Sequence, residues 1–203
     1  MRPLIVILTL VLTVPIIVAQ TGGSSSAEGE SAAGTAAQMA FFTRPLNPEE
    51  RPSRAPFQDA MLVDLEGAMH RLPLSFDPPT KQFRVRTNAH ERVLLLPQIH
   101  EIAQWNRLRI VSVTVRTAGG SRECPGVVLV DGQALLYRHY GVDRTEYFSK
   151  MRDDEYAEII GLRRRDLRMV FREHPARVEP LLKQHRTFQR EPLLIELFQL
   201  YND

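Results

Sequence analysis

The sequence predicts an α+β fold, in which a mixed sheet of short strands is followed by a helical C-terminal part. Between residues 57 and 140, short runs alternate apolar and polar side chains with the two-residue period of strands. After Gly141, apolar side chains recur at the three- and four-residue spacing of helices. This order of strands first and helices last is typical of the α+β class.

Composition bounds the kind of protein. The 203 residues are 43% apolar and 25% charged, which is ordinary for one globular domain. The formal net charge of +2 gives no reason to expect nucleic acid as a partner. A single cysteine excludes an intramolecular disulfide.

Residues 1–19 have the pattern of an export segment. Arg2 precedes an uncharged run at residues 4–18 that is apolar apart from Thr9 and Thr13, and Pro15 stands shortly before Ala19. The run is short for a membrane span and suits a signal peptide cleaved after Ala19. The alternative is an uncleaved membrane anchor through residues 4–18. Either interpretation predicts an exported chain, with the rest of the protein in the periplasm or outside the cell.

Residues 20–56 are predicted to be a linker. Residues 20–38 are small and polar without periodicity, which is typical of a flexible tether. Residues 39–56 carry four prolines and the apolar pair Phe41 and Phe42, a mixture that predicts an extended arm lying on its own domain or on a neighbour. One folded domain is expected from residue 57 to residue 203.

The strands follow from alternation and from turn residues. Residues 60–64 and 69–76 flank a Leu65-Glu66-Gly67 turn and predict a hairpin. Two apolar runs around Asp131-Gly132 predict a second, tight hairpin. The strands outside the first hairpin are predicted at residues 82–87, 92–96, 108–116, 127–130 and 134–140.

One helix is expected within this series, opened by Pro97, with Ile99, Ile102 and Trp105 among its inward positions. It gives residues 92–140 the order strand, helix, strand, loop, Pro125, strand, turn, strand, with a helix after them. This βαβ…ββα order resembles the second half of a thioredoxin-like domain, in which a proline precedes the penultimate strand. The resemblance covers about a quarter of the chain and lacks a Cys-X-X-Cys motif.

The C-terminal helical part is expected from about residue 143 to residue 203. Asp143 is a candidate N-cap, and Glu146 three residues later completes a capping box. Gly161, Pro175 and Pro192 then separate successive helices. These helices are predicted at residues 153–160, 162–173, 176–188 and 192–201.

Few residues have the pattern of a catalytic or metal site. Cys124 would be a reactive thiol if a base lowered its pKa, whereas the simpler interpretation is a small buried residue at the start of a strand. The six histidines include no pair spaced to bind zinc from one helix. No motif for a cofactor is present. The sequence therefore predicts neither a metal site nor a cofactor.

Two features of the C-terminal part favour contacts with another protein. Arg165, Arg168 and Arg172 share one face of a predicted helix, although acidic neighbours would also allow a solvated surface. The tail has more apolar positions than one helical stripe needs, including Leu197, Phe198 and Tyr201. These three side chains either dock on their own domain or insert into a partner.

These observations favour a non-catalytic role. We expect an exported or membrane-tethered envelope protein that acts as a binding or assembly component, with other envelope proteins as partners. The alternative is an exported thioredoxin-like or thiol-dependent protein centred on Cys124.

Overall fold

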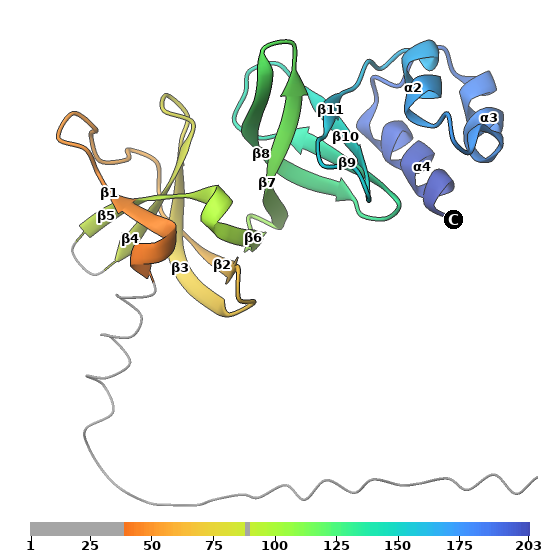
Figure 1. The fold of residues 1–203 in the computed structure, drawn as a ribbon. Helices are drawn as coiled ribbons and strands as arrows, with labels where there is room; N and C mark the ends of the chain where they lie inside the picture. Colours follow the sequence, from red (N-terminus) through yellow and green to blue (C-terminus); the bar gives the residue numbers. More distant parts are fainter. Residues whose placement is uncertain (1–38, 88–89) are drawn as a thin grey trace, which may run out of the picture.

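In the computed structural model, which describes residues 39–87 and 90–203, the chain forms one eleven-stranded antiparallel sheet with helices packed near its C-terminal end (Figure 1). The strands are β1 (Thr43–Pro45), β2 (Gln58–Asp64), β3 (Met69–Asp77), β4 (Gln82–Thr87), β5 (His90–Leu94), β6 (Ile99–Trp105), β7 (Leu108–Thr117), β8 (Gly120–Val130), β9 (Ala134–His139), β10 (Tyr147–Met151) and β11 (Glu158–Ile159). The helices are the 3-10 turn η1 (Leu96–Gln98), α2 (Arg164–Val170), α3 (Pro175–Gln184) and α4 (Glu191–Asn202).

The predicted fold class is wrong. The sheet order is β1-β5-β4-β3-β2-β6-β7-β8-β9-β10-β11, and each of these ladders is antiparallel. Among the described strands, no ladder has the parallel, crossover-connected pairing that a thioredoxin-like βαβ element requires. The described residues therefore form a mainly β protein, with neither a mixed α+β sheet nor a helical part beginning at residue 143.

The expected helix after Pro97 is the strand β6. Its buried side chains, Ile99, Ile102 and Trp105, are three residues apart, which suggested helical periodicity. The ladders that β6 forms with β2 and β7 contain register shifts. Such a bulge inserts one extra residue into the strand, so successive buried side chains lie three residues apart instead of two. The spacing therefore comes from an irregular strand.

Strands β1 to β6 form the first half of the sheet and curl around one core. Leu62, Leu74, Phe83, Val85 and Ile102 are among its most deeply buried side chains. The helical turn at residues 39–42 adds Met39 and Phe42 to the same core. The predicted β2–β3 hairpin is confirmed: Val63 pairs with Met69 at the end of the ladder next to the turn.

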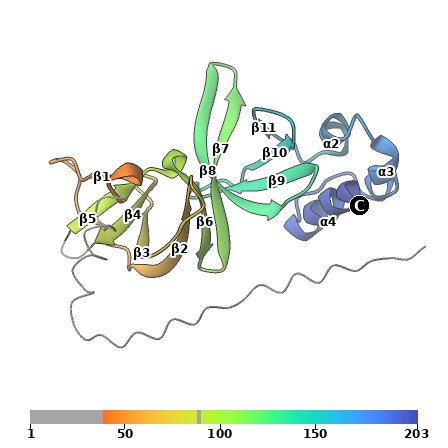
Figure 2. The same ribbon diagram turned by 60° about the horizontal axis from the view of Figure 1, so that its bottom comes forward.

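The hairpin of β7 and β8 separates this first half from the rest of the molecule (Figure 2). Its end nearest β6 gives Ile110 and Val127 to the first core. Further along, Val113 and Cys124 join a separate cluster. The same cluster contains Ala157, which accepts from the Arg116 N–H and donates to the Thr114 carbonyl, each at 2.9 Å. These bonds join the chain beyond β10 back to β7, so the second half of the sheet closes into a small barrel.

Residues 143–160 contain strands where helices were expected. The ring of Phe148 points into the small barrel, whereas Tyr147 faces the C-terminal helices. Glu146, expected to complete a capping box, lies 3.2 Å from the His139 ring and 3.4 Å from Arg122. Pairing with β9 and cross-strand contacts therefore override the local helical pattern. The hairpin predicted around Asp131-Gly132 is confirmed as β8–β9.

Helix α4 packs on β8 and β9, α3 packs on α4, and α2 packs on α3. Leu194, Leu197, Phe198 and Tyr201 form the buried stripe of α4. The helix is also held at both ends. Arg138 and the Tyr147 hydroxyl donate to Glu191, while the Asn202 amide makes two hydrogen bonds, of 2.8 and 3.0 Å, to the backbone of Ala134.

A proline-rich arm, residues 46–57, crosses the outer face of β3 and β4. The Ser53 hydroxyl lies 3.1 Å from that of Ser75, which also donates to the Ala55 carbonyl. Next to Ser75 in the ladder is Arg84, the largest fully buried side chain among those described. Its guanidinium lies 3.4 Å from Asp77 and 3.9 Å from Glu50 of the arm. The arm is thus joined to the sheet through a buried charge.

The sheet also includes residues that precede the expected domain start at residue 57, because β1 pairs with β5. The predicted export segment, residues 1–19, and the tether, residues 20–38, lie outside the described residues. Within residues 39–87 and 90–203, no helix is both long enough and apolar enough to cross a membrane.

Candidate functional site

The apolar residues predicted to bind a partner, Leu197, Phe198 and Tyr201, are buried in the protein's own core. The Phe171 ring packs against Phe198 and Tyr201, with ring centroids 4.9 Å apart in each pair. None of the three residues is therefore available on the surface of this chain.

The arginines predicted to bind a partner are exposed but differ in their surroundings. Arg165 lies 3.2 Å from Asp166. Arg168 donates to Glu179 at 2.6 Å, and this bond lowers the pKa of the Glu179 carboxyl. Arg172 forms no ion pair with any described residue and lies just beyond the end of α2. Arg165 and Arg168 are therefore engaged within the chain, whereas Arg172 is free to meet a ligand.

Arg172 borders a cleft between the β10–β11 hairpin and α2, which we call the α2 cleft. Its volume is about 480 Å³. The β10–β11 hairpin forms one wall and α2 forms the other. Only residues 160–163 connect these two walls along the chain. The distance between the walls is therefore set by how α2 packs on the sheet. At Gly161 in this link, a Cβ atom would collide with the Asp166 side chain. The lining consists of Ala134, Ser149, Lys150, Met151, Asp154, Glu158, Ile159, Ile160, Gly161, Asp166, Met169, Val170, Arg172 and Glu173.

The α2 cleft combines exposed apolar surface with unpaired charge. Met169 is 66% exposed and Ile159 is 49% exposed. Asp154 and Glu173 form no ion pair within the described part of the chain. Glu158 forms only a long ion pair, of 3.9 Å, with Arg116. Four carboxylates line the cleft, against two cations, Lys150 and Arg172. The cleft therefore suits a segment with an apolar side chain and a positive charge.

Sequence reasoning found Arg172 but missed Met169 and Ile159. One signal was available: Met169 is an apolar residue on the side of the α2 sequence occupied by arginines, away from Leu167, Val170 and Phe171. Ile159 gave no such signal, because residues 153–160 were expected to be helical. The cleft itself depends on the packing of α2 beside β11, which no local pattern encodes.

Cys124 is buried on β8 at the edge of another cavity, of about 240 Å³, between the β4–β5 side of the first half and the β7–β8 hairpin. Burial raises the pKa of its thiol, and the nearby Arg122 charge only partly opposes this effect. A nucleophilic thiol needs the opposite shift, since the thiolate is the reactive form. The environment of Cys124 therefore suits the structural interpretation of this residue.

We expect a thiol-reactive dye to label native Cys124 slowly near neutral pH. Burial and the raised pKa both reduce the accessible thiolate, so labelling should be about tenfold or more slower than in urea. Stopped-flow absorbance measures both rates, with a Cys124→Ser variant as the blank. Equal rates in native and unfolded protein would contradict this assignment.

The histidines do not gather into a site. His70 lies 2.8 Å from Asp64, and His139 lies 3.2 Å from Glu146, so each has one carboxylate neighbour. Over residues 39–87 and 90–203, no three potential metal-binding side chains come close enough to hold an ion.

No protein-family model, no curated protein and no solved structure matches this chain.

Proposed function

We propose that this protein is an exported, non-catalytic binding component of a cell-envelope assembly, and that the α2 cleft receives a segment of a partner protein. The observation that carries the proposal is the combination of exposed Met169 and Ile159 with carboxylates that lack partners in the described chain. Exposed apolar surface rimmed by charged groups is typical of interaction sites. The buried setting of Cys124 gives no support to thiol chemistry.

The proposed location is supported by the composition of residues 1–19. A charged residue, a mainly apolar run and a segment of small polar residues follow one another, as in exported proteins. The partner would then be another envelope protein. Its binding segment should present an apolar side chain to Met169 and a lysine or arginine to Asp154 or Glu173.

A photo-crosslinking amino acid at position 169 should give a discrete adduct with one envelope protein in intact cells. The matched control is position 200, because Leu200 is also a surface apolar residue on a C-terminal helix but lies away from the cleft lining. Asp154→Asn combined with Glu173→Gln should reduce the adduct, since the partner's charge would lose its counterions. Adducts of equal yield from positions 169 and 200 would contradict the proposal.

Export is tested separately. Residues 1–38 fused to a reporter that is active only outside the cytosol should give activity. A well-expressed but inactive fusion would refute the envelope location, while the crosslinking result would still decide whether the α2 cleft binds a protein.

A further inference from the structure

We propose that the cavity beside Cys124 binds a free α-amino acid with an apolar side chain. We call it the β4–β8 cavity, because it lies between the β4–β5 side of the first half and the β7–β8 hairpin. Its volume of about 240 Å³ is below the ~300–1,000 Å³ of pockets for drug-sized molecules, so its ligand must be small. The inference is independent of the proposed function, since this cavity shares no lining residue with the α2 cleft.

Two of the three charged side chains that line the β4–β8 cavity have no partner in the described part of the chain. Lys81 and Glu123 are both exposed, and neither forms an ion pair with the other or with any further described residue. The third, Arg44, is paired with Glu50 at 2.7 Å. A small molecule that carries both a carboxylate and an ammonium group would therefore meet one free cation and one free anion.

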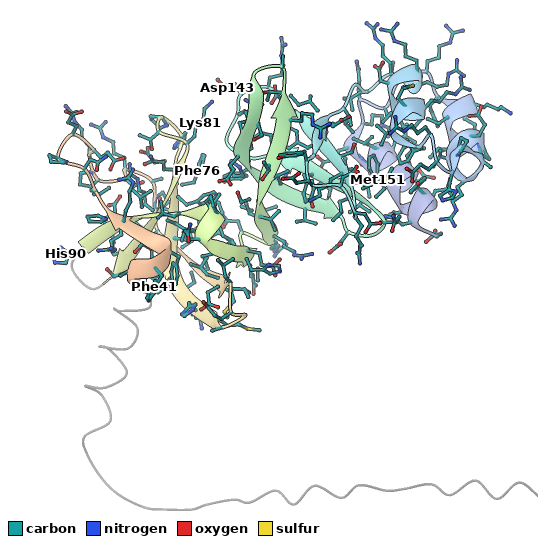
Figure 3. The ribbon with its side chains drawn as sticks, viewed as in Figure 1. Phe41, Phe76, Lys81, His90, Asp143 and Met151 are labelled. Atoms are coloured by element: carbon teal, nitrogen blue, oxygen red, sulfur yellow. The ribbon has the colours of Figure 1, made fainter. Side chains whose placement is uncertain are left out.

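Lys81 occupies a backbone conformation that suits other residues better. It ends the turn between β3 and β4 with φ +55°, in the left-handed region (Figure 3). Glycine or asparagine adopts this conformation with less strain than lysine. The Lys81 charge nevertheless acts on the cavity: burial raises the pKa of the Cys124 thiol, and Lys81 is among the cations that oppose this effect. The turn thus places a cation at the cavity that its own geometry does not require.

The next residue, Gln82, supplies an unsatisfied acceptor. Its side-chain amide oxygen, Oε1, is buried and accepts no hydrogen bond from any described residue. Gln82 also lines the β4–β8 cavity. Buried polar atoms nearly always have a hydrogen-bond partner, so an unpartnered one in the wall of a cavity indicates a donor on a bound molecule. An ammonium group beside a carboxylate held by Lys81 can donate this hydrogen bond.

The apolar part of the lining suits an apolar side chain. Leu95, Leu96, Pro97 and Pro125 line the cavity, and none of them is fully buried. The first three lie at the start of η1, whereas Pro125 lies on β8, in the other wall. An aliphatic side chain placed between them would remove apolar surface from water on both walls. The cavity therefore offers a counterpart for each part of an apolar amino acid: carboxylate, ammonium group and side chain.

Equilibrium dialysis of the full-length protein against radiolabelled L-leucine tests the inference. Unlabelled L-leucine should displace the label. Two analogues each lack one charge: 4-methylpentanoate has no ammonium group, and 3-methylbutylamine has no carboxylate. Each analogue should compete about tenfold or more less well than L-leucine, because it leaves one charged group of the cavity without its partner.

Variants of the two free charges assign the site. Lys81→Asn removes the cation and introduces a residue that tolerates a positive φ, so the fold should be retained. Glu123→Gln removes the anion without a change of shape. Each variant should bind L-leucine about tenfold more weakly than wild type. Lys150→Asn, which alters a lysine of the α2 cleft, is the matched control and should bind as wild type does. Circular dichroism checks that each variant is folded.

Absence of L-leucine binding at millimolar concentrations would overturn the inference. Equal competition by L-leucine and its two analogues would also overturn it, as would wild-type binding by both the Lys81→Asn and the Glu123→Gln proteins. None of these results bears on crosslinking at position 169, which tests the α2 cleft alone.

Discussion

Replacing Phe198 by alanine is expected to lower the free energy of unfolding by about 3–5 kcal/mol. The ring is fully buried between α2 and α4 and packs edge-on against Phe171. Alanine removes the apolar contacts and leaves a cavity, which neighbouring helices fill only in part. Because native domains are stable by only about 5–15 kcal/mol, this loss is a large share of the total stability.

Urea titration followed by circular dichroism measures this loss. Leu200→Ala is the matched control, since Leu200 lies two residues away on the same helix and is 36% exposed. Its cost should be below about 1 kcal/mol. A stable Phe198→Ala protein that loses only its crosslinked partner would show that the tail is an interface after all.

Removing the carboxylates around Arg84 should destabilise the protein by a similar amount. In a variant with Glu50→Gln and Asp77→Asn, the buried guanidinium keeps its charge but has no anion nearby. Breaking a buried ion pair from one side costs about 3–5 kcal/mol, because the remaining charge stays out of water. Adding Arg84→Met to this variant should restore much of the loss.

The same network predicts a dependence on acid. The Arg44 side-chain hydrogen bond, aided by the Asn47 N–H, lowers the pKa of Glu50 to about 2. Its value in the unfolded chain is about 4.3. Stability from this carboxylate is therefore complete above pH 4.3 and is lost as the pH falls toward 2. Urea titrations at pH 7 and pH 3 should differ less for Glu50→Gln than for wild type; an unchanged difference would contradict the assignment.

Turn residues made parts of the fold predictable. The Leu65-Glu66-Gly67 and Asp131-Gly132 segments predict both hairpins correctly. A positive φ or a tight reversal of the chain requires particular residues at these positions. Gly67, for example, has φ +86°. The stretches predicted as helices at residues 162–173, 176–188 and 192–201 overlap α2, α3 and α4. In each of these regions the local chemistry agrees with the final structure.

The errors arise where distant parts of the chain decide the conformation. The β6 bulges give Ile99, Ile102 and Trp105 a helical spacing, although they belong to a strand. Ala157 joins β7 through hydrogen bonds to residues more than 40 positions away, which no window of sequence reveals. The α2 cleft depends on the same kind of packing, so only Arg172 among its lining residues was predicted.

The β7–β8 hairpin, which contributes buried side chains to three separate clusters, also determines how the molecule would carry a pulling force. Its strands stand across the line from strands β1–β6 to the C-terminal helices (Figure 2). Because hydrogen bonds between antiparallel strands run perpendicular to the strands, tension between the two ends would stretch these bonds along their own axes. The β7–β8 ladder pairs eight residues on each strand without interruption, whereas β6–β7 has two pairs and a register shift. Tension between the two halves of the sheet would therefore break the β6–β7 ladder first, and the small barrel would stay joined to the C-terminal helices.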